Sequence, residues 1–539
     1  MRVFTRGDTV VYGVLTSVTL AALAFFAWRW SSGEWSPAVV VLTLLGLAAI
    51  VLQQLRWLAL PRMVRPRRIE PEQGLQVAVV TTFMPDVEPL EMLHTTLLGL
   101  VGMEYPHDTW VLDEGDDPRV RQLCAAVGAH HFSRRAVEAY NQPVGTFKSA
   151  SKHGNYNAWL HAVGFGSYDV LVAFDPDHIP SPGYLVEVLG FLRDPRVGYV
   201  QAAQVYYNQR ASFIARGSAE ETYAYYSSIC MTVAASGFPT VVGCHSTHRM
   251  QALHDVGGFA AHDADDVLIS LLYRRHGWQG VYVPKPLALG LTPVDWDGYL
   301  RQQRRWARSV LDIEFRRLPA LTSKLPKRTR LLSLLHGLYY LQGAAICVTV
   351  GVLALAQVRP LHLPAAAVLW LPAVLLAGTL LACRLFRQRF YLSPREEAGF
   401  LWRALVLRFA KWPALTLALV DVVRRHEPAY AVTSKTRRPG TARFVTAAQL
   451  VAVLVLLVAL AAGVAMDSGT TSAHLVAAVL VAASLAVFAT EFRQFPPPFD
   501  PELARRAAAR LAHDASPPAS PGTDSAGLPA DRRRTSAVD

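Results

Sequence analysis

Six long apolar runs mark the 539-residue chain, and a more polar region separates the second run from the third. Each run has about the twenty apolar residues that an α-helix needs to cross a bilayer. Trp or Tyr lies at several of their ends, as is typical of the membrane–water interface. The runs cover residues 10–29, 37–59, 331–357, 363–384, 444–466 and 472–491. The pattern predicts a bundle of six membrane spans.

The segment 398–423 is apolar but interrupted by Arg403, Arg408, Lys411 and Pro413. We interpret it as an amphipathic helix lying in the inner membrane interface. A seventh span is the alternative.

Short apolar strands and helical stretches alternate between residues 75 and 315. The expected strands are 75–83, 109–115, 168–178 and 197–207, and the expected helices include 89–101, 118–128 and 151–164. This alternation predicts an α/β domain with a mostly parallel sheet, whose ligands bind at the carboxyl ends of the strands.

These patterns divide the chain into six parts. They are an N-terminal transmembrane hairpin (1–61), the α/β domain with interfacial helices (62–325), a second hairpin (326–390), an interfacial helix and loop (391–443), a third hairpin (444–492) and a disordered tail (493–539). The first hairpin is interpreted as retained rather than as a signal peptide, because a second apolar run follows almost at once. The Pro-, Ala-, Ser- and Arg-rich tail is expected to hold one short helix at 501–513.

The charge pattern predicts that the α/β domain lies in the cytoplasm. The protein is expected to be an integral protein of a bacterial-type inner or plasma membrane. Only 17% of the residues are charged, and the net charge of +12 comes partly from arginine clusters at 62–68 and 384–389 that flank apolar runs. Basic flanks of this kind stay on the cytoplasmic side. Because no basic–aromatic RNA motif is present, nucleic-acid binding is not expected. The five cysteines show no metal-ligand spacing, so they are expected to be reduced and zinc is not expected.

The segment "VLVAFDPDHIP" (170–180) ends an apolar strand with Asp175 and Asp177, followed by His178. Carboxylates so placed are typical ligands of a hard divalent cation that also holds phosphate oxygens. A plain Asx-type turn set by the neighbouring prolines is the alternative.

Three further segments carry candidate chemistry. In "HDADD" (262–266), Asp266 precedes a helix and would either contribute to capping or act as a general base. In "TWVLDEG" (109–115), Asp113 ends a strand where a nucleotide base or ribose could be contacted, although a polar turn explains it equally well. Lys152 lies near a helix start, where a diphosphate could be met.

In this order, DEG…KHGN…DPDH…DD…RRHGW…QQRRW, the motifs resemble the processive family-2 glycosyltransferases, especially bacterial cellulose synthase catalytic subunits. The resemblance covers about residues 75–320 and extends to the flanking spans. Its most specific element is Gln-x-x-Arg-Trp, met by Gln302, Arg305 and Trp306. Downstream, "YAVTSK" (430–435) is similar to the family's gating loop.

The resemblance implies a GT-A-like domain inserted in a helical membrane bundle, and a role for each matching residue. The nucleotide-sugar would be bound by Asp113, Lys152, Asp175, Arg305, Thr433 and Lys435. Asp177 would bind Mg²⁺ or Mn²⁺, and Asp266 would be the base that deprotonates the acceptor hydroxyl. Gln302 and Trp306 would hold the acceptor sugar, together with Cys244 and His245. Arg301, Arg304 and Arg308, beside the Gln-x-x-Arg-Trp residues, are interpreted as contacts to lipid headgroups.

The implied activity is processive, inverting polymerisation of a UDP-sugar, with UDP-glucose as the expected donor, and translocation of the β-linked polysaccharide. Accessory export proteins are expected partners beside the growing polymer and the bilayer. The family's Thr-Glu-Asp is replaced by Ala264-Asp265-Asp266, and its acceptor stretch by "VVGCHS" (241–246). These departures leave three alternatives open. They are a chitin- or hyaluronan-like synthase, a non-processive enzyme that glycosylates a lipid, and a non-catalytic transport or scaffold subunit.

Overall fold

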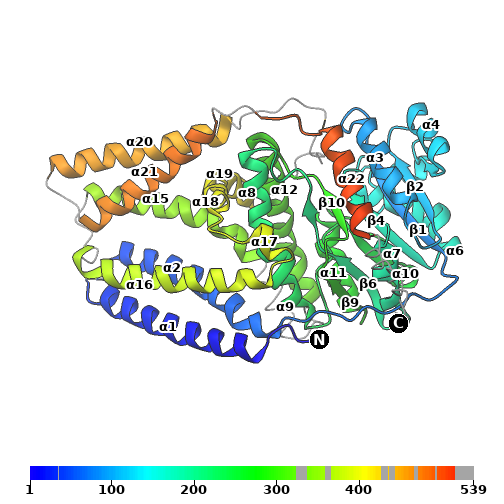
Figure 1. Cartoon of the computed structure of the whole chain (residues 1–539). Coiled ribbons are helices and arrows are strands. Elements are labelled where there is room, and N and C mark those ends of the chain that lie inside the picture. Colours follow the sequence, from blue (N-terminus) through cyan, green and yellow to red (C-terminus); the bar gives the residue numbers. More distant parts are fainter. Residues whose placement is uncertain are drawn as a thin grey trace, which may run out of the picture.

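In the computed structural model, a bundle of long helices lies beside an α/β domain (Figure 1). The structure describes residues 1–33, 35–322, 337–358, 366–426, 435, 443–466, 471–491 and 495–515. The chain enters the bundle at its N-terminus, builds the α/β domain, and then returns to the bundle (Figure 1).

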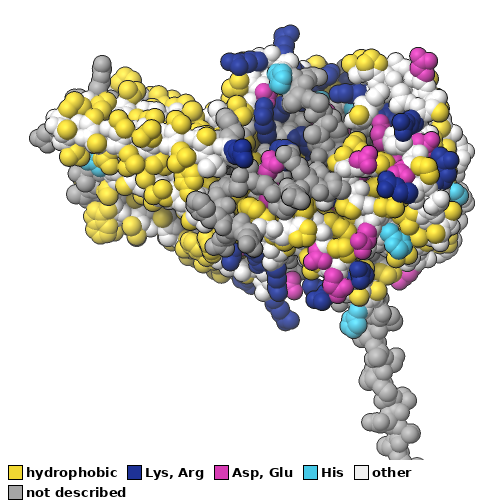
Figure 2. All heavy atoms as spheres, turned by 90° about the horizontal axis from the view of Figure 1, so that it is seen from above, with side chains coloured by type: hydrophobic (Ala, Val, Ile, Leu, Met, Phe, Trp, Pro, Cys, Tyr) yellow, Lys and Arg dark blue, Asp and Glu magenta, His cyan; other side chains and the backbone are white. Residues whose placement is uncertain are grey.

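Six helices in the described part of the chain are long and apolar enough to cross a membrane, which confirms the predicted bundle. They are α1 (Arg6–Ser31), α2 (Pro37–Ala59), α15 (Gln342–Val358), α16 (Ala366–Arg387), α20 (Arg443–Ala465) and α21 (Thr471–Glu491). Helix α1 packs along α16, and α15 packs against α20 and α21. Lysine and arginine side chains gather where the apolar bundle meets the α/β domain (Figure 2).

Two short helices, α18 (Trp402–Ala410) and α19 (Trp412–Val423), form the interrupted apolar segment. With 9 and 12 residues, neither has the length of a span. Helix α18 packs against α8 (Phe213–Ala224), and α19 packs against both α12 (Trp296–Asp312) and span α15. This pair of helices therefore connects the α/β domain to the bundle.

A seven-stranded mixed sheet forms the centre of the α/β domain, in the order β3-β2-β1-β4-β8-β6-β9. The strands are β1 (Val77–Phe83), β2 (Asp108–Asp113), β3 (His130–Phe132), β4 (Val170–Phe174), β6 (Val197–Ala202), β8 (Ser246–Arg249) and β9 (Gln279–Val283). All neighbours pair in parallel except β8, which is antiparallel to both β4 and β6. The sheet is thus mostly parallel, as predicted, with one reversed strand at its centre.

Helices cover both faces of this sheet and enclose two apolar cores. They include α3 (Leu90–Val101), α4 (Pro118–Val127), α5 (Lys152–Trp159), α7 (Tyr184–Val188), α10 (Met250–Val256) and α11 (Asp265–Arg275). Strand β1 is almost entirely buried, which explains its near-continuous apolar sequence. Strand order reverses between β1 and β4, so a crevice for ligands is expected at their carboxyl ends.

The C-terminal helix α22 (Pro501–Ala515) packs on the α/β domain against α3 and β5 (Ile179–Pro180) (Figure 1). Its Ala507 and Leu511 join an apolar cluster that includes Ile179. Strand β5 belongs to a small second sheet with β10 (Ala288–Gly290) and β7 (Val205–Tyr206). The helix expected near 501–513 is therefore packed beside the strand that follows Asp177 and His178.

Candidate active site

The two carboxylates of the D-x-D segment follow β4, and each contacts a lysine from a different part of the chain. Asp175 Oδ1 lies 2.5 Å from Nζ of Lys152, which comes from the first turn of α5. The same ammonium donates to the Gly243 carbonyl at 2.7 Å. Burial alone would lower the pKa of Lys152, but Asp175, together with Tyr156, Asp265 and Cys244, raises it well above its usual value.

Asp177 is buried and held from two sides. Its Oδ2 lies 2.8 Å from Lys435 Nζ, and its Oδ1 accepts a hydrogen bond from His178 Nδ1 at 2.9 Å. Burial alone would raise the pKa of Asp177, yet the positive charges of Lys435 and His178 lower it below the ordinary range. Lys435 is itself fixed by a bond from its backbone N–H to the Val87 carbonyl, 3.0 Å away. Thr433 lies outside the described residues.

Asp265 and Asp266 begin α11, and both lie close enough to Lys152 for its charge to lower their pKa values. The residue before them, Ala264, has no side chain that caps the helix, and Asp266 Oδ1 accepts from the Val267 N–H at 2.8 Å. Burial and the neighbouring Asp265 carboxylate raise the pKa of Asp266 to about 7, while Lys152 and Arg305 act in the opposite direction. At neutral pH this carboxyl group is therefore poised between its acidic and basic forms.

The loop before β8 brings backbone close to Asp266. Gly243 has a φ of +74°, and a Cβ at this position would lie 3.2 Å from Asp266 Oδ2. Glycine is favoured here both by the left-handed conformation and by the short distance. Because the Gly243 carbonyl also binds Lys152, this loop links the D-x-D segment to the Asp265–Asp266 pair.

Helix α12 presents Gln302, Arg305 and Trp306, all half-buried. Arg305 is close enough to Asp266 to lower its pKa. Other arginines of this helix bind protein carboxylates: Arg304 lies 2.6 Å from Asp421 of α19, and Arg308 lies 3.0 Å from Asp263. Arg308, whose side chain is only 9% exposed, therefore does not fit the interpretation as a headgroup contact. For Arg304, whose side chain is 39% exposed, that interpretation stays a prediction.

Asp113 ends β2 with a fully buried side chain. Its carboxylate accepts from the N–H groups of Gly115 (2.9 Å) and Asp117 (2.6 Å), and it lies 3.1 Å from His131 Nε2. These bonds shape the loop that lines a cleft of about 550 Å³ at the ends of β1 and β2. Pro85, Asp86, Glu114, Asp116 and Arg135 are among the lining residues.

Comparison with known proteins points to a family for the α/β domain. Residues 76–309 match the family described as "Glycosyltransferase like family 2". The chain contains a family-2 glycosyltransferase domain.

Curated relatives of this glycosyltransferase domain are cellulose synthases. Cellulose synthase 1 of Komagataeibacter xylinus is 26% identical over 314 residues, which are 54% of this chain and 19% of that protein. The cellulose synthase catalytic subunit (UDP-forming) of Xanthomonas axonopodis pv. citri is 27% identical over 357 residues, 63% of this chain and 47% of that protein. The chain thus spans between a fifth and a half of the length of these relatives.

Among solved structures, the chain is similar to the mannosyltransferase PcManGT from Pyrobaculum calidifontis in complex with GDP-Man and Mn²⁺. The two are 17% identical with a TM-score of 0.46, and the match covers 72% of this chain and 99% of that one.

The D-x-D end of the glycosyltransferase domain fits a hard divalent cation. Asp175, Asp177 and His178 offer ligand atoms that all lie within 4.8 Å of one another. Carboxylate oxygens are the preferred ligands of Mg²⁺ and are equally suitable for Mn²⁺. Lys152 and Lys435 neutralise these carboxylates in the structure, as a cation would.

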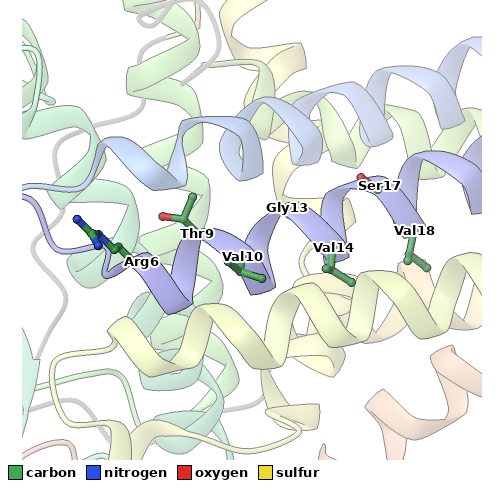
Figure 3. A pocket seen from close by; sticks show the side chains of 7 residues that line it. All are labelled: Arg6, Thr9, Val10, Gly13, Val14, Ser17 and Val18. Atoms are coloured by element: carbon green, nitrogen blue, oxygen red, sulfur yellow. The ribbon is translucent and has the colours of Figure 1, made fainter.

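The larger of the two hollows described lies far from this chemistry. It measures about 670 Å³ and lies on one outer face of α1, where Val10, Gly13, Val14 and Val18 line it (Figure 3). The lining is mostly apolar, with Arg6, Thr9 and Ser17 as its polar members. Since α1 is a candidate span, the hollow belongs to the surface expected to face lipid.

Among the other groups of the site, Glu88 and Arg134 have no signal in the sequence, whereas Cys244 and His245 are expected from it as acceptor contacts. Cys244 and His245 are fully buried and lie with His178 in a second cluster of potential metal ligands. Glu88 comes from the loop after β1, and burial raises its pKa to about 8, with the Asp177 charge adding to the effect. Arg134 is buried and forms a two-pronged pair with Glu114 (2.8 and 3.1 Å). Only the fold brings these residues to the carboxyl ends of the strands.

Proposed function

We propose that the chain is a membrane-embedded, inverting glycosyltransferase that polymerises a UDP-sugar, with UDP-glucose as the expected donor. It would extend a β-linked polysaccharide and pass it through the bundle. One observation carries the proposal: the pKa of Asp266 is raised to about 7, and the carboxyl group is close enough to both Lys152 of the Lys152–Asp175 pair and Arg305 for their charges to act on it.

Asp266 would act as the general base. Its carboxylate would remove the proton of the acceptor hydroxyl as that oxygen forms a bond to the donor's anomeric carbon. The bond from this carbon to the diphosphate would break on the opposite face, UDP would leave with the electron pair, and the configuration would invert. A base whose pKa is close to the working pH is the most effective for such a step.

The leaving diphosphate would be stabilised by cationic side chains of this chain. Lys152, Arg305 and Lys435 all lie near the D-x-D carboxylates or the base. Charges fixed in advance around a leaving group lower the barrier without reorganisation. Asp175 and Asp177 would hold Mg²⁺ or Mn²⁺, which when bound supplies a Lewis acid for the diphosphate oxygens.

The nucleoside would occupy the cleft at the ends of β1 and β2. Its walls include Glu114, Asp116 and backbone of the loop that Asp113 fixes. Asp113 would thus act on the nucleotide through the conformation of this loop, because its side chain is buried. Thr433 would join the closure over the nucleotide with Lys435.

The acceptor would bind beside α12. The indole of Trp306 offers an apolar face for sugar C–H groups, and Gln302 offers hydrogen bonds one turn earlier on the helix. Cys244 and His245 would contribute only through their loop backbone, because their side chains are buried. Helix α12 packs against α19, which in turn packs against span α15. An extended product would thus leave the site toward the bundle, while the domain lies in the cytoplasm.

A panel of radiolabelled UDP-sugars tests this proposal. Membranes containing the full chain would be incubated with each donor and with Mg²⁺ or Mn²⁺, and the products digested with linkage-specific hydrolases. We expect a long polymer from one donor, degraded by a β-glucanase. A single sugar added to a lipid would contradict processive synthesis, and no transfer from any donor would contradict the enzymatic function itself.

A further inference from the structure

Two buried histidines and one buried cysteine meet behind the D-x-D segment. His178 follows β4, while Cys244 and His245 belong to the loop before β8. The ligand atoms of the three side chains lie within 4.8 Å of one another. The side chains of Cys244 and His245 are fully buried, and His178 is only 5% exposed.

Both imidazoles are oriented by a bond at Nδ1. His178 Nδ1 lies 2.9 Å from Asp177 Oδ1, and His245 Nδ1 lies 3.1 Å from the carbonyl oxygen of Ala203. Carboxylate and carbonyl oxygens only accept, so Nδ1 carries a proton in each ring, and Nε2 is the nitrogen that a metal ion can bind. Metal-binding histidines are typically oriented in this way, by an oxygen that binds the ring nitrogen away from the metal.

The other nitrogen of each ring then has at most the Cys244 thiol as a partner among the described residues. His178 Nε2 and His245 Nε2 are buried and accept no hydrogen bond of standard geometry from the described residues. The Cys244 thiol lies beside His178, but its single proton would serve at most one of the two nitrogens. Buried polar atoms normally have a partner, and two such atoms beside one thiol point to a shared ligand.

The loop that carries Cys244 and His245 is held firmly in place. His245 has a φ of +55°, which is rare for a residue with a side chain. The Gln201 amide donates to the carbonyls of Cys244 and His245 at 2.8 and 3.2 Å. The Asp175 N–H donates to Cys244 Sγ at 3.2 Å, a contact that also stabilises a thiolate. Strain kept in this manner is typical of functional sites.

We propose that His178 Nε2, Cys244 Sγ and His245 Nε2 bind a transition-metal ion of the Zn²⁺ class. Two imidazoles and a thiolate suit such an ion, whereas Mg²⁺ prefers oxygen ligands. Tetrahedral zinc ligands lie about 3.3–3.6 Å apart, so modest side-chain movement closes the cluster around the ion. On binding, the thiol proton of Cys244 and the Nε2 proton of the cationic His178 ring leave to solvent, and a fourth position remains for water.

This ion would be distinct from the one at the D-x-D carboxylates. The His178 ring separates the two positions, with Nδ1 toward Asp177 and Nε2 toward Cys244 and His245. The ion would tie the end of β4 to the loop before β8. Through His178 it would also fix the Asp177 carboxylate, so its expected role is to position the donor site.

Cobalt titration tests the site on the full chain. The purified protein is stripped with a chelator and titrated with Co²⁺, whose bond to a thiolate gives intense near-ultraviolet absorption. We expect one Co²⁺ per chain with this absorption, loss of the signal on adding Zn²⁺, and no loss with excess Mg²⁺. Absence of the thiolate signal in the wild-type protein would overturn the proposal.

Variants then locate the signal. Cys244→Ser should abolish it, whereas Cys124→Ser, which changes another buried cysteine, should retain it. Asp175→Asn should also retain it, because a D-x-D carboxylate does not contribute the sulfur. A signal that survives in Cys244→Ser, or disappears in Cys124→Ser, would refute the assignment. If Cys244→Ser fails to fold, the folded wild-type protein is alkylated with and without Zn²⁺, and is then unfolded and digested to quantify modified Cys244. We expect Zn²⁺ to reduce the alkylation of Cys244, and equal alkylation in both samples would refute the assignment. The readout needs no sugar transfer, so its failure would leave the proposed function in place.

Discussion

Nζ of Lys435 lies 2.8 Å from Oδ2 of Asp177, so a residue late in the chain neutralises a carboxylate that lies at the end of β4. Both side chains are about nine-tenths buried. A divalent cation bound at Asp177 would have to displace this ammonium group. Cation binding at Asp177 should therefore be coupled to release of the Lys435 side chain from this carboxylate.

Lys435→Met should strengthen Mn²⁺ binding in the absence of nucleotide while weakening turnover. Removing the ammonium leaves Asp177 without a competing positive charge, so we expect a several-fold lower Kd for Mn²⁺. Calorimetry on the purified protein measures this change. Lys285→Met is the control, because Lys285 pairs with Glu187 at 2.6 Å outside the site. Unchanged Mn²⁺ affinity in Lys435→Met would contradict competition at Asp177.

The rate of transfer should rise with pH through the region near 7. Only the ionised form of Asp266 accepts a proton, and its raised pKa means that this form is lost as the pH falls below about 7. Asp265→Asn removes the like charge that contributes to this pKa, while Lys152 and Arg305 continue to lower it. The acidic limb of kcat/KM should therefore move to lower pH by up to about one pH unit. A limb that stays in place, or moves upward, would show that another group controls it.

Gly243→Ala should impair catalysis more than folding. The new Cβ would lie 3.2 Å from Asp266 Oδ2 and displace the base. Displacement of a catalytic group by even part of an ångström is costly, and we expect kcat to fall about tenfold or more. Gly237→Ala is a matched control, since Gly237 has a φ of +78° but no atom within 4 Å of the added Cβ. Equal losses of kcat in both variants would attribute the effect to backbone strain alone.

Arg308→Met should destabilise the protein whatever lipid surrounds it. Arg308 is 7% exposed and pairs with Asp263, so its removal leaves a carboxylate without its guanidinium partner. Breaking a buried pair costs about 3 kcal/mol, whereas loss of an exposed pair costs less than about 1 kcal/mol. Arg301→Met is the control, because Arg301 is half-exposed and pairs with Asp297 one turn away. Thermal unfolding in neutral detergent measures both variants. Equal Tm values there, with a difference only in anionic lipid, would restore the interpretation as a headgroup contact.

The sequence predicts the parts of this protein that depend on local patterns. Spans are found because bilayer thickness fixes their length, and β1 and β4 because buried parallel strands are apolar throughout. Strand β8 escapes prediction, since Ser246, Thr247 and His248 are polar residues that find partners only in the sheet. For a similar reason, the sequence does not predict the cluster of His178, Cys244 and His245. His178 is 66 positions from Cys244, and no spacing rule joins them.

Asp266 is the proposed base of the sugar-transfer site, and this role is central to the proposed function. Its most direct test is UDP release by the purified full chain with UDP-glucose, or the donor selected from the panel, in the presence of Mn²⁺. Asp266→Asn keeps the size of the side chain but removes the base, so turnover should fall by about 10²–10⁴-fold while the protein remains folded. Asp194→Asn, which changes an exposed carboxylate paired with Arg196, should leave turnover unchanged. UDP release by Asp266→Asn at the wild-type rate would contradict the account.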